Sequence, residues 1–173
     1  MVKILGCALF ERSSAVTIVV GVGAVKYADL ANDRIRDYVF HWDRMLAFDG
    51  NTAPYLMYAH ARICSLLRKA GAAQEDAGGV TALRIEAPAE RALALELLEF
   101  PGTIAAVGES LQPHRLCQRL FQIATAFTRF YEACPVLSAV PEVRTSRLIL
   151  SGLTARVLAC GLDALGIGAP QQM

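Results

Sequence analysis

Tyr131 is a candidate contact for an unpaired nucleic-acid base. It ends an apolar stripe whose steps of four, three, four and four residues predict one face of a long helix. The earlier members of the stripe are Leu116, Leu120, Ile123 and Phe127. A predicted loop from Cys134 to Pro141 follows, and a tyrosine beside a loop can stack on an unpaired base. On residues alone, a tyrosine at the rim of the core with its hydroxyl in water is the favoured interpretation.

Basic residues concentrate in the last third of the chain, although the formal net charge is only +1. Residues 72–110 are predominantly acidic, whereas residues 111–173 carry six arginines against three carboxylates. Those arginines are Arg115, Arg119, Arg129, Arg144, Arg147 and Arg156. A surface that binds phosphates is therefore expected in this third or on the basic stretch from Arg62 to Lys69.

Patterns typical of metal, nucleotide or nucleophile chemistry find no support. His41, His60 and His114 form no pair at helical spacing, so no metal site is predicted, and His60 is expected to be a packing residue. The run that starts at Gly21 resembles a dinucleotide fingerprint, but Lys26 occupies its third glycine position. The five cysteines lack a CxxC pair, which favours reduced thiols in a cytoplasmic protein.

The elements that would position these residues are helices. From Thr52 onward the periodicity predicts an all-α fold, an antiparallel helical bundle with short connections. The expected helices span about residues 53–70, 88–100, 103–109, 113–133 and 141–165. Asn51 or Thr52 offers the first N-cap, and Gly71 and Gly166 are expected C-caps. Residues 1–20 fit either strands or one buried helix, and the apolar run 13–25 is too short to cross a bilayer.

Long segments of the sequence resemble arginyl-tRNA synthetases. The first are GVGAVKYADL at 21–30 and DYVFHWDRMLAFDGNTAPYLMYAHAR at 37–62. Shorter pieces resemble the DALR-type anticodon-binding domain of the same family. They are LQPH at 111–114, FTRFYE at 127–132, CPVL at 134–137, RL at 147–148, LTARVL at 153–158 and GLDALGI at 161–167, with Pro170 and Met173.

The resemblance implies how the chain is divided and what it does. Residues 20–52 would be the C-terminal remnant of the catalytic domain and residues 53–173 the anticodon-binding bundle of a class Ia synthetase, with residues 1–19 unmatched. The full-length family uses ATP with Mg to join arginine to tRNA(Arg), through HIGH-like and KMSKS-like segments that this sequence lacks. We therefore expect this chain alone to need no cofactor and to be inactive. Its expected partners are tRNA(Arg) and a catalytic domain supplied in trans, with no membrane and no DNA.

The resemblance also assigns candidate anticodon-loop residues. Tyr131 matches a tyrosine that the family uses at the anticodon loop, so the resemblance favours a binding role for this residue over a purely structural one. Met173 matches a methionine near the same pocket. Arg129, Arg144 and Arg147 are candidate phosphate contacts.

A second group of residues lies in the family's strongest local motif. The first expectation for Asn51, Thr52 and Tyr55 is a structural role: they would form a turn and an N-cap and pack against the catalytic domain. Two alternatives to an anticodon-binding part stay open: a stand-alone RNA-binding or regulatory module, and a non-functional product of a truncated synthetase gene.

Overall fold

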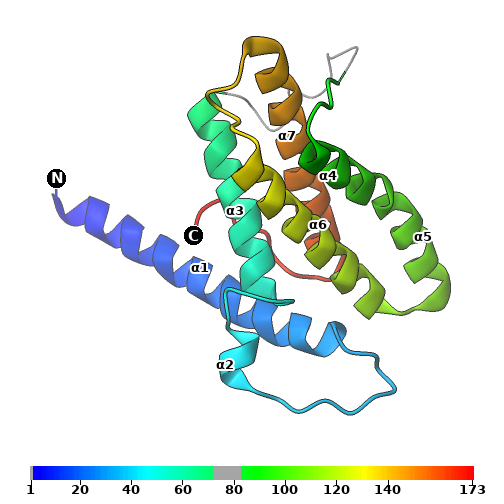
Figure 1. Cartoon of the computed structure of the whole chain (residues 1–173). Coiled ribbons are helices and arrows are strands. Elements are labelled where there is room, and N and C mark those ends of the chain that lie inside the picture. Colours follow the sequence, from blue (N-terminus) through cyan, green and yellow to red (C-terminus); the bar gives the residue numbers. More distant parts are fainter. Residues whose placement is uncertain (1, 72–82) are drawn as a thin grey trace.

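The computed structural model describes residues 2–71 and 83–173, with side chains from residue 16 onward. Within these ranges all regular structure is helical, as predicted (Figure 1). The helices are α1 (Val2–Leu30), α2 (Trp42–Met45), α3 (Ala53–Ala70), α4 (Pro88–Leu98), α5 (Phe100–Ser110), α6 (Pro113–Ala133) and α7 (Pro141–Ala164). No helix of the described residues is long and apolar enough to cross a membrane.

Helices α3, α6 and α7 form the centre of the bundle, with α1 and α4 packed against them (Figure 1). The start of α7 lies near the end of α3, as the hydrogen bond from Arg144 to the Ala70 carbonyl shows. Near its other end α7 meets the first half of α6, where Gly161 contacts Leu120. Helix α7 therefore runs antiparallel to both α3 and α6, as the sequence predicts.

The capping predictions for α3 are confirmed. The Thr52 hydroxyl accepts the Tyr55 N–H at 3.3 Å, and Pro54 occupies the first turn, where its missing N–H costs nothing. At the other end Gly71 adopts a left-handed φ of 68° and closes the helix. Arg68 and Lys69 lie in the last turn, where cations are favoured by the helix dipole.

The predicted stripe of α6 is also confirmed. Its first four members are buried in the core, and Tyr131 lies half-buried at the rim. In α7, Leu150 and Leu162 are buried, whereas Leu153 and Val157 are half-exposed. Thr154 takes a core position instead, because its hydroxyl donates to the Leu150 carbonyl and needs no water.

Two boundaries differ from the sequence prediction. Residues 2–20, whose pattern fits either strands or a helix, belong to α1, which continues to Leu30. The contacts explain the helix: Val20, Ala24 and Tyr27 meet the bundle at helical spacing. Helix α5 begins at Phe100 instead of Thr103, since Pro101 fits a first turn.

The α6–α7 crossing gives a direct test of the packing. A Cβ at Gly161 would overlap the side chain of Leu120, with Cδ1 at 3.0 Å and Cγ at 3.1 Å. We expect Gly161→Ala to lower the free energy of unfolding by about 1–3 kcal/mol, as overpacking does. Gly108→Ala is the matched control: nothing lies within 4 Å of its Cβ, so a gain of up to about 1 kcal/mol is expected. Urea denaturation measures both, and equal effects of the two changes would contradict the packing.

Candidate functional site

Tyr131 is held at the rim of the core by two neighbours. The Arg62 guanidinium carbon lies 4.3 Å from the centroid of the Tyr131 ring, which is a cation–π contact. The ring of Phe127, one turn earlier, lies 6.0 Å away centroid to centroid. Sequence reasoning missed Arg62 as the partner of Tyr131, although it did mark residues 62–69 as basic. The tyrosine is thus positioned and still partly exposed.

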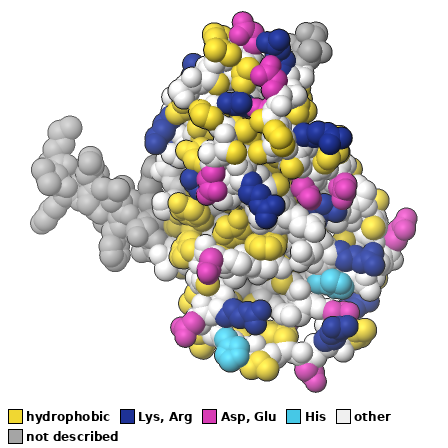
Figure 2. Space-filling view, in the orientation of Figure 1, with side chains coloured by type: hydrophobic (Ala, Val, Ile, Leu, Met, Phe, Trp, Pro, Cys, Tyr) yellow, Lys and Arg dark blue, Asp and Glu magenta, His cyan; other side chains and the backbone are white. Residues whose placement is uncertain are grey.

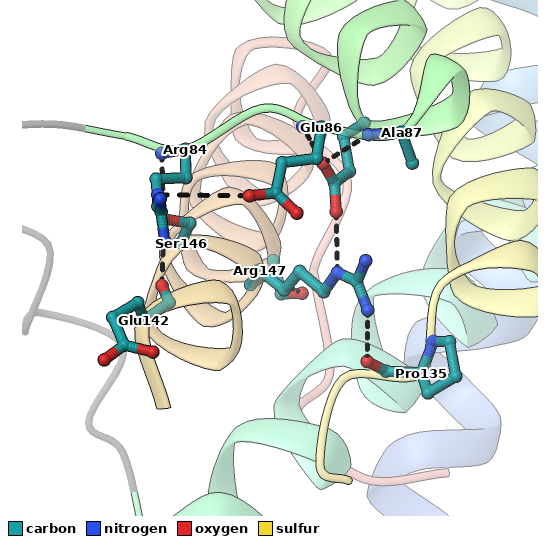
Figure 3. Close-up of polar contacts among 9 residues, drawn as sticks. Arg84, Glu86, Ala87, Pro135, Glu142, Ser146 and Arg147 are labelled. Carbon is teal, nitrogen blue, oxygen red and sulfur yellow. Dashed lines mark hydrogen bonds and ion pairs between the residues drawn. The ribbon is translucent and has the colours of Figure 1, made fainter. Parts of the chain in front are cut away.

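Arg147 does not lie free on the surface, as a phosphate contact would. Its Nε donates to Glu90 Oε1 at 2.6 Å and its Nη1 donates to the Pro135 carbonyl at 2.7 Å (Figure 3). The side chain of Arg147 is 13% exposed and that of Glu90 is 1% exposed. Arg147 therefore joins α7 to α4 and to the loop that follows Tyr131. The role of Arg147 as a phosphate contact stays a prediction, and two of its guanidinium nitrogens serve internal partners.

Glu90 is the centre of this polar cluster. Its Oε2 accepts the N–H of Glu86 at 2.7 Å and of Ala87 at 3.0 Å, which caps the start of α4 (Figure 3). Ala87 has no side-chain acceptor of its own, so the cap comes from Glu90 alone. Burial tends to raise the pKa of Glu90, but the Ala87 N–H and the Arg147 guanidinium outweigh it and hold that pKa below its ordinary value.

The other two candidate arginines differ in exposure. Arg144 is half-buried, and its Nη2 donates to the Ala70 carbonyl at 3.5 Å, which stabilises the C-terminus of α3. Arg129 is exposed on α6, beside a hollow of about 320 Å³ between α4 and α6. Of the three arginines chosen from the sequence, Arg129 is the one whose side chain is open to a ligand.

Met173 is 46% exposed, at the end of a segment that runs back along α3. Two side chains of α3 bind carbonyls of that segment: His60 binds the Pro170 carbonyl and Arg68 binds the Gln171 carbonyl. The structure therefore brings Gln171, two residues before Met173, to α3, the helix whose Arg62 contacts Tyr131.

The motif of Asn51, Thr52 and Tyr55 lies at the junction of α1 with the bundle. The Tyr27 hydroxyl is 2.6 Å from the Asn51 side chain and 2.9 Å from the Cys117 carbonyl. Both partner atoms are acceptors, Asn51 Oδ1 and the Cys117 carbonyl oxygen, and the single proton of the Tyr27 hydroxyl serves them. Burial raises the pKa of Tyr27, which keeps it protonated.

Further contacts of the motif tie it to its surroundings. The Thr52 hydroxyl donates to the Ala47 carbonyl at 2.7 Å. The Tyr55 hydroxyl lies 3.4 Å from that of Thr128 on α6, and its ring packs near Phe121. These contacts support the structural interpretation of all three motif residues.

An aromatic surface is exposed in the segment before α3. Trp42 is 62% exposed and lies edge-on to Phe40, and Phe48 is edge-on to Tyr58. An open cavity of about 850 Å³ lies between this segment and the end of α1. Exposed apolar side chains such as these two aromatic pairs are typical of a surface that contacts another polypeptide.

On the face shown in Figure 2, the described residues form no continuous basic patch. Figure 2 shows lysine and arginine side chains spread over it and mixed with acidic ones. Nonspecific attraction to a polyanion is therefore modest on this face, and recognition of a nucleic acid would depend on particular contacts.

Comparison with known families yields two matches. Residues 56–173 match the DALR anticodon binding domain, and residues 7–42 match the catalytic domain of tRNA synthetases class I (R). The second match begins inside the segment 1–19 that the sequence analysis left unmatched, and the domain boundaries stay predictions.

Individual relatives agree with these matches. The chain is 58% identical to an arginine–tRNA ligase of Frankia casuarinae over 88% of this chain and 26% of that protein. It is 54% identical to an arginine–tRNA ligase of Thermobifida fusca, over 94% of this chain and 28% of that protein. The solved arginyl-tRNA synthetase of Thermus thermophilus superposes with a TM-score of 0.80 at 37% identity, over 90% of this chain and 27% of that one. The chain thus spans about a quarter of the length of the relatives it matches.

Proposed function

Since the chain belongs to the arginyl-tRNA synthetase family and carries its DALR anticodon-binding domain, we propose that it binds the anticodon loop of tRNA(Arg). The observation that carries the proposal is the setting of Tyr131. An aromatic ring fixed by Arg62 at the rim of a rigid bundle, and still partly exposed, is a platform on which an unpaired base can stack.

The remaining candidate residues would contribute to binding in different ways. Arg129 is exposed and suits a phosphate, which would contribute affinity without sequence information. Met173, on the segment beside α3, would supply an apolar contact to a base near Tyr131. Arg144 and Arg147 act through the bundle, by fixing the start of α7 against α3 and α4.

The described residues do not fit the ATP that the full-length family uses. The run from Gly21 to Lys26 lies inside α1, in its last third, where backbone N–H groups serve the helix and cannot cradle phosphates. Lys26 itself donates to the Gly166 carbonyl. We therefore propose that the chemistry belongs to the rest of a catalytic domain, either continuous with this chain or supplied in trans. The exposed surface of Phe40, Trp42 and Phe48 is where that domain would pack.

Binding to tRNA transcripts tests the proposal. We expect the 173-residue chain to prefer a tRNA(Arg) transcript over the same transcript with a changed anticodon, by about 5-fold or more, the loss of one stacked base. Fluorescence anisotropy at two salt concentrations separates this preference from phosphate attraction. Equal affinity for both transcripts at both concentrations would overturn anticodon binding and favour the stand-alone RNA-binding module. Aminoacylation by this chain alone is expected to stay at the buffer level.

A further inference from the structure

The segment 166–173 is held to the bundle through its backbone. Lys26 Nζ of α1 donates to the Gly166 carbonyl at 2.7 Å. On α3, His60 Nδ1 lies 2.9 Å from the Pro170 carbonyl and Arg68 Nη1 donates to the Gln171 carbonyl at 3.2 Å. Side chains from two helices thus bind three carbonyls of the segment that follows α7, and they fix its path whatever side chains it carries.

Packing fixes the beginning of this segment as well. Ile167 is buried, and its Cγ2 lies 3.1 Å from the position that a Cβ on Gly23 would take. A Cβ on Gly168 would lie 2.9 Å from Val19 Cγ1, so the backbone approaches α1 closely there. The segment therefore passes over α1 before it reaches α3.

His60 is the buried member of the three donors, with 2% of its surface exposed. The Pro170 carbonyl can only accept a hydrogen bond, so Nδ1 of His60 must carry a proton. Nε2 then accepts from the Cys64 thiol, whose sulfur lies 3.6 Å away. Burial lowers the pKa of His60, which favours this neutral tautomer. Both ring nitrogens are thus satisfied, and the imidazole has one defined orientation.

The segment ends beside α3. His60 and Arg68 are separated by roughly 12 Å along the axis of α3. Arg62, which contacts Tyr131, lies at a height between them but on another face of the helix. Gln171 is held at Arg68, and Met173 lies within about 7 Å of it along the chain. Side chains of α3 therefore hold Pro170 and Gln171, the last residues of the chain before Gln172 and Met173.

We propose that His60 is a positioning residue, which fixes segment 166–173 along α3 and thereby places Met173 for contact with the anticodon loop. The placement of the segment stands on the contacts above, and its role in RNA recognition rests on the proposed function. His60→Leu removes the donor and keeps an apolar side chain of similar size. His60→Asn is the matched control, because its amide nitrogen can take the place of Nδ1.

The first arm of the experiment needs no RNA. We expect ¹⁵N relaxation of residues 168, 169, 171 and 172 to report an ordered backbone in the wild-type chain and in His60→Asn, and fast motion in His60→Leu. An ordered segment in His60→Leu would overturn the proposal. If His60→Leu does not fold, a chain ending at residue 169 replaces it in the second arm.

The second arm measures the ratio of affinities for tRNA(Arg) and for the transcript with a changed anticodon. We expect His60→Leu and the chain ending at residue 169 to lose the same part of this ratio, about 5-fold, and the combined variant to lose no more. A mobile segment with the wild-type ratio intact would overturn the positioning role. A wild-type chain without any preference contradicts the proposed function and with it the role of His60 in recognition, while the first arm still decides whether His60 holds the segment.

Discussion

Arg147→Ala should lower the free energy of unfolding by about 3–5 kcal/mol at neutral pH, the cost of leaving a buried charge without its partner. The Glu90 carboxylate is 1% exposed and would keep only the N–H groups of Glu86 and Ala87. The Pro135 carbonyl would also lose its donor. Urea denaturation at pH 7.5 measures the loss.

The effect should depend on pH with a definite sign. In the wild-type chain the pKa of Glu90 is below its ordinary value, so its contribution to stability is present above that ordinary value and is lost as pH falls through the lowered pKa. Without Arg147, burial acts against fewer opposing groups and the pKa of Glu90 rises. Protonation then relieves the unpaired charge, so the difference between variant and wild type should shrink from pH 7.5 to pH 4.5.

Arg119→Ala is the matched control for Arg147→Ala. Arg119 pairs with Glu96 and Glu99, whose side chains are 33% and 64% exposed, so its loss should cost only about 0–1 kcal/mol. Arg147→Lys should fall between the two, because an ammonium cannot reach both Glu90 and Pro135 with the fork of a guanidinium. A loss at Arg147 no larger than at Arg119, or one independent of pH, would show that Glu90 does not depend on this partner.

The sequence predicts helices well here because caps and periodicity are local. Thr52 and Gly71 bound α3 where they should, and the stripe of α6 is buried. Residues 1–20 could not be assigned, because a β-branched run has the same pattern in a strand and in a buried helix. The buried position of Thr154 was missed for a related reason, since a hydroxyl that bonds its own helix is as well satisfied in the core as in water.

The candidate site was harder to predict, because its contacts join residues far apart in the chain. Nothing local marks Arg147 as the partner of Glu90, 57 residues away, or distinguishes it from exposed Arg129. The contact between Arg62 and Tyr131 likewise depends on how α3 and α6 pack. Residue type gave the chemistry of these side chains, but only the fold shows which charges face inward.

The largest effect on recognition is expected at Tyr131. If the ring stacks on an unpaired base, Tyr131→Ala should cost about 1–3 kcal/mol of binding to tRNA(Arg) and much less of binding to a transcript with a changed anticodon. Tyr131→Phe keeps the ring and the contact with Arg62, so it should retain most of the preference. Fluorescence anisotropy with both transcripts gives the two affinities for each variant.

Two controls separate stacking from the other roles that a half-buried tyrosine can have. Arg129→Ala should weaken binding to both transcripts alike and reduce its dependence on salt, because a phosphate contact carries little sequence information. A purely structural Tyr131 would instead show a lower melting temperature with the anticodon preference unchanged, since Phe127 and Arg62 lose a neighbour in the alanine variant. Both quantities should therefore be measured on the same protein. If Tyr131→Ala destabilises the bundle while the ratio of the two affinities stays at the wild-type value, Tyr131 belongs to the core and the anticodon is read elsewhere.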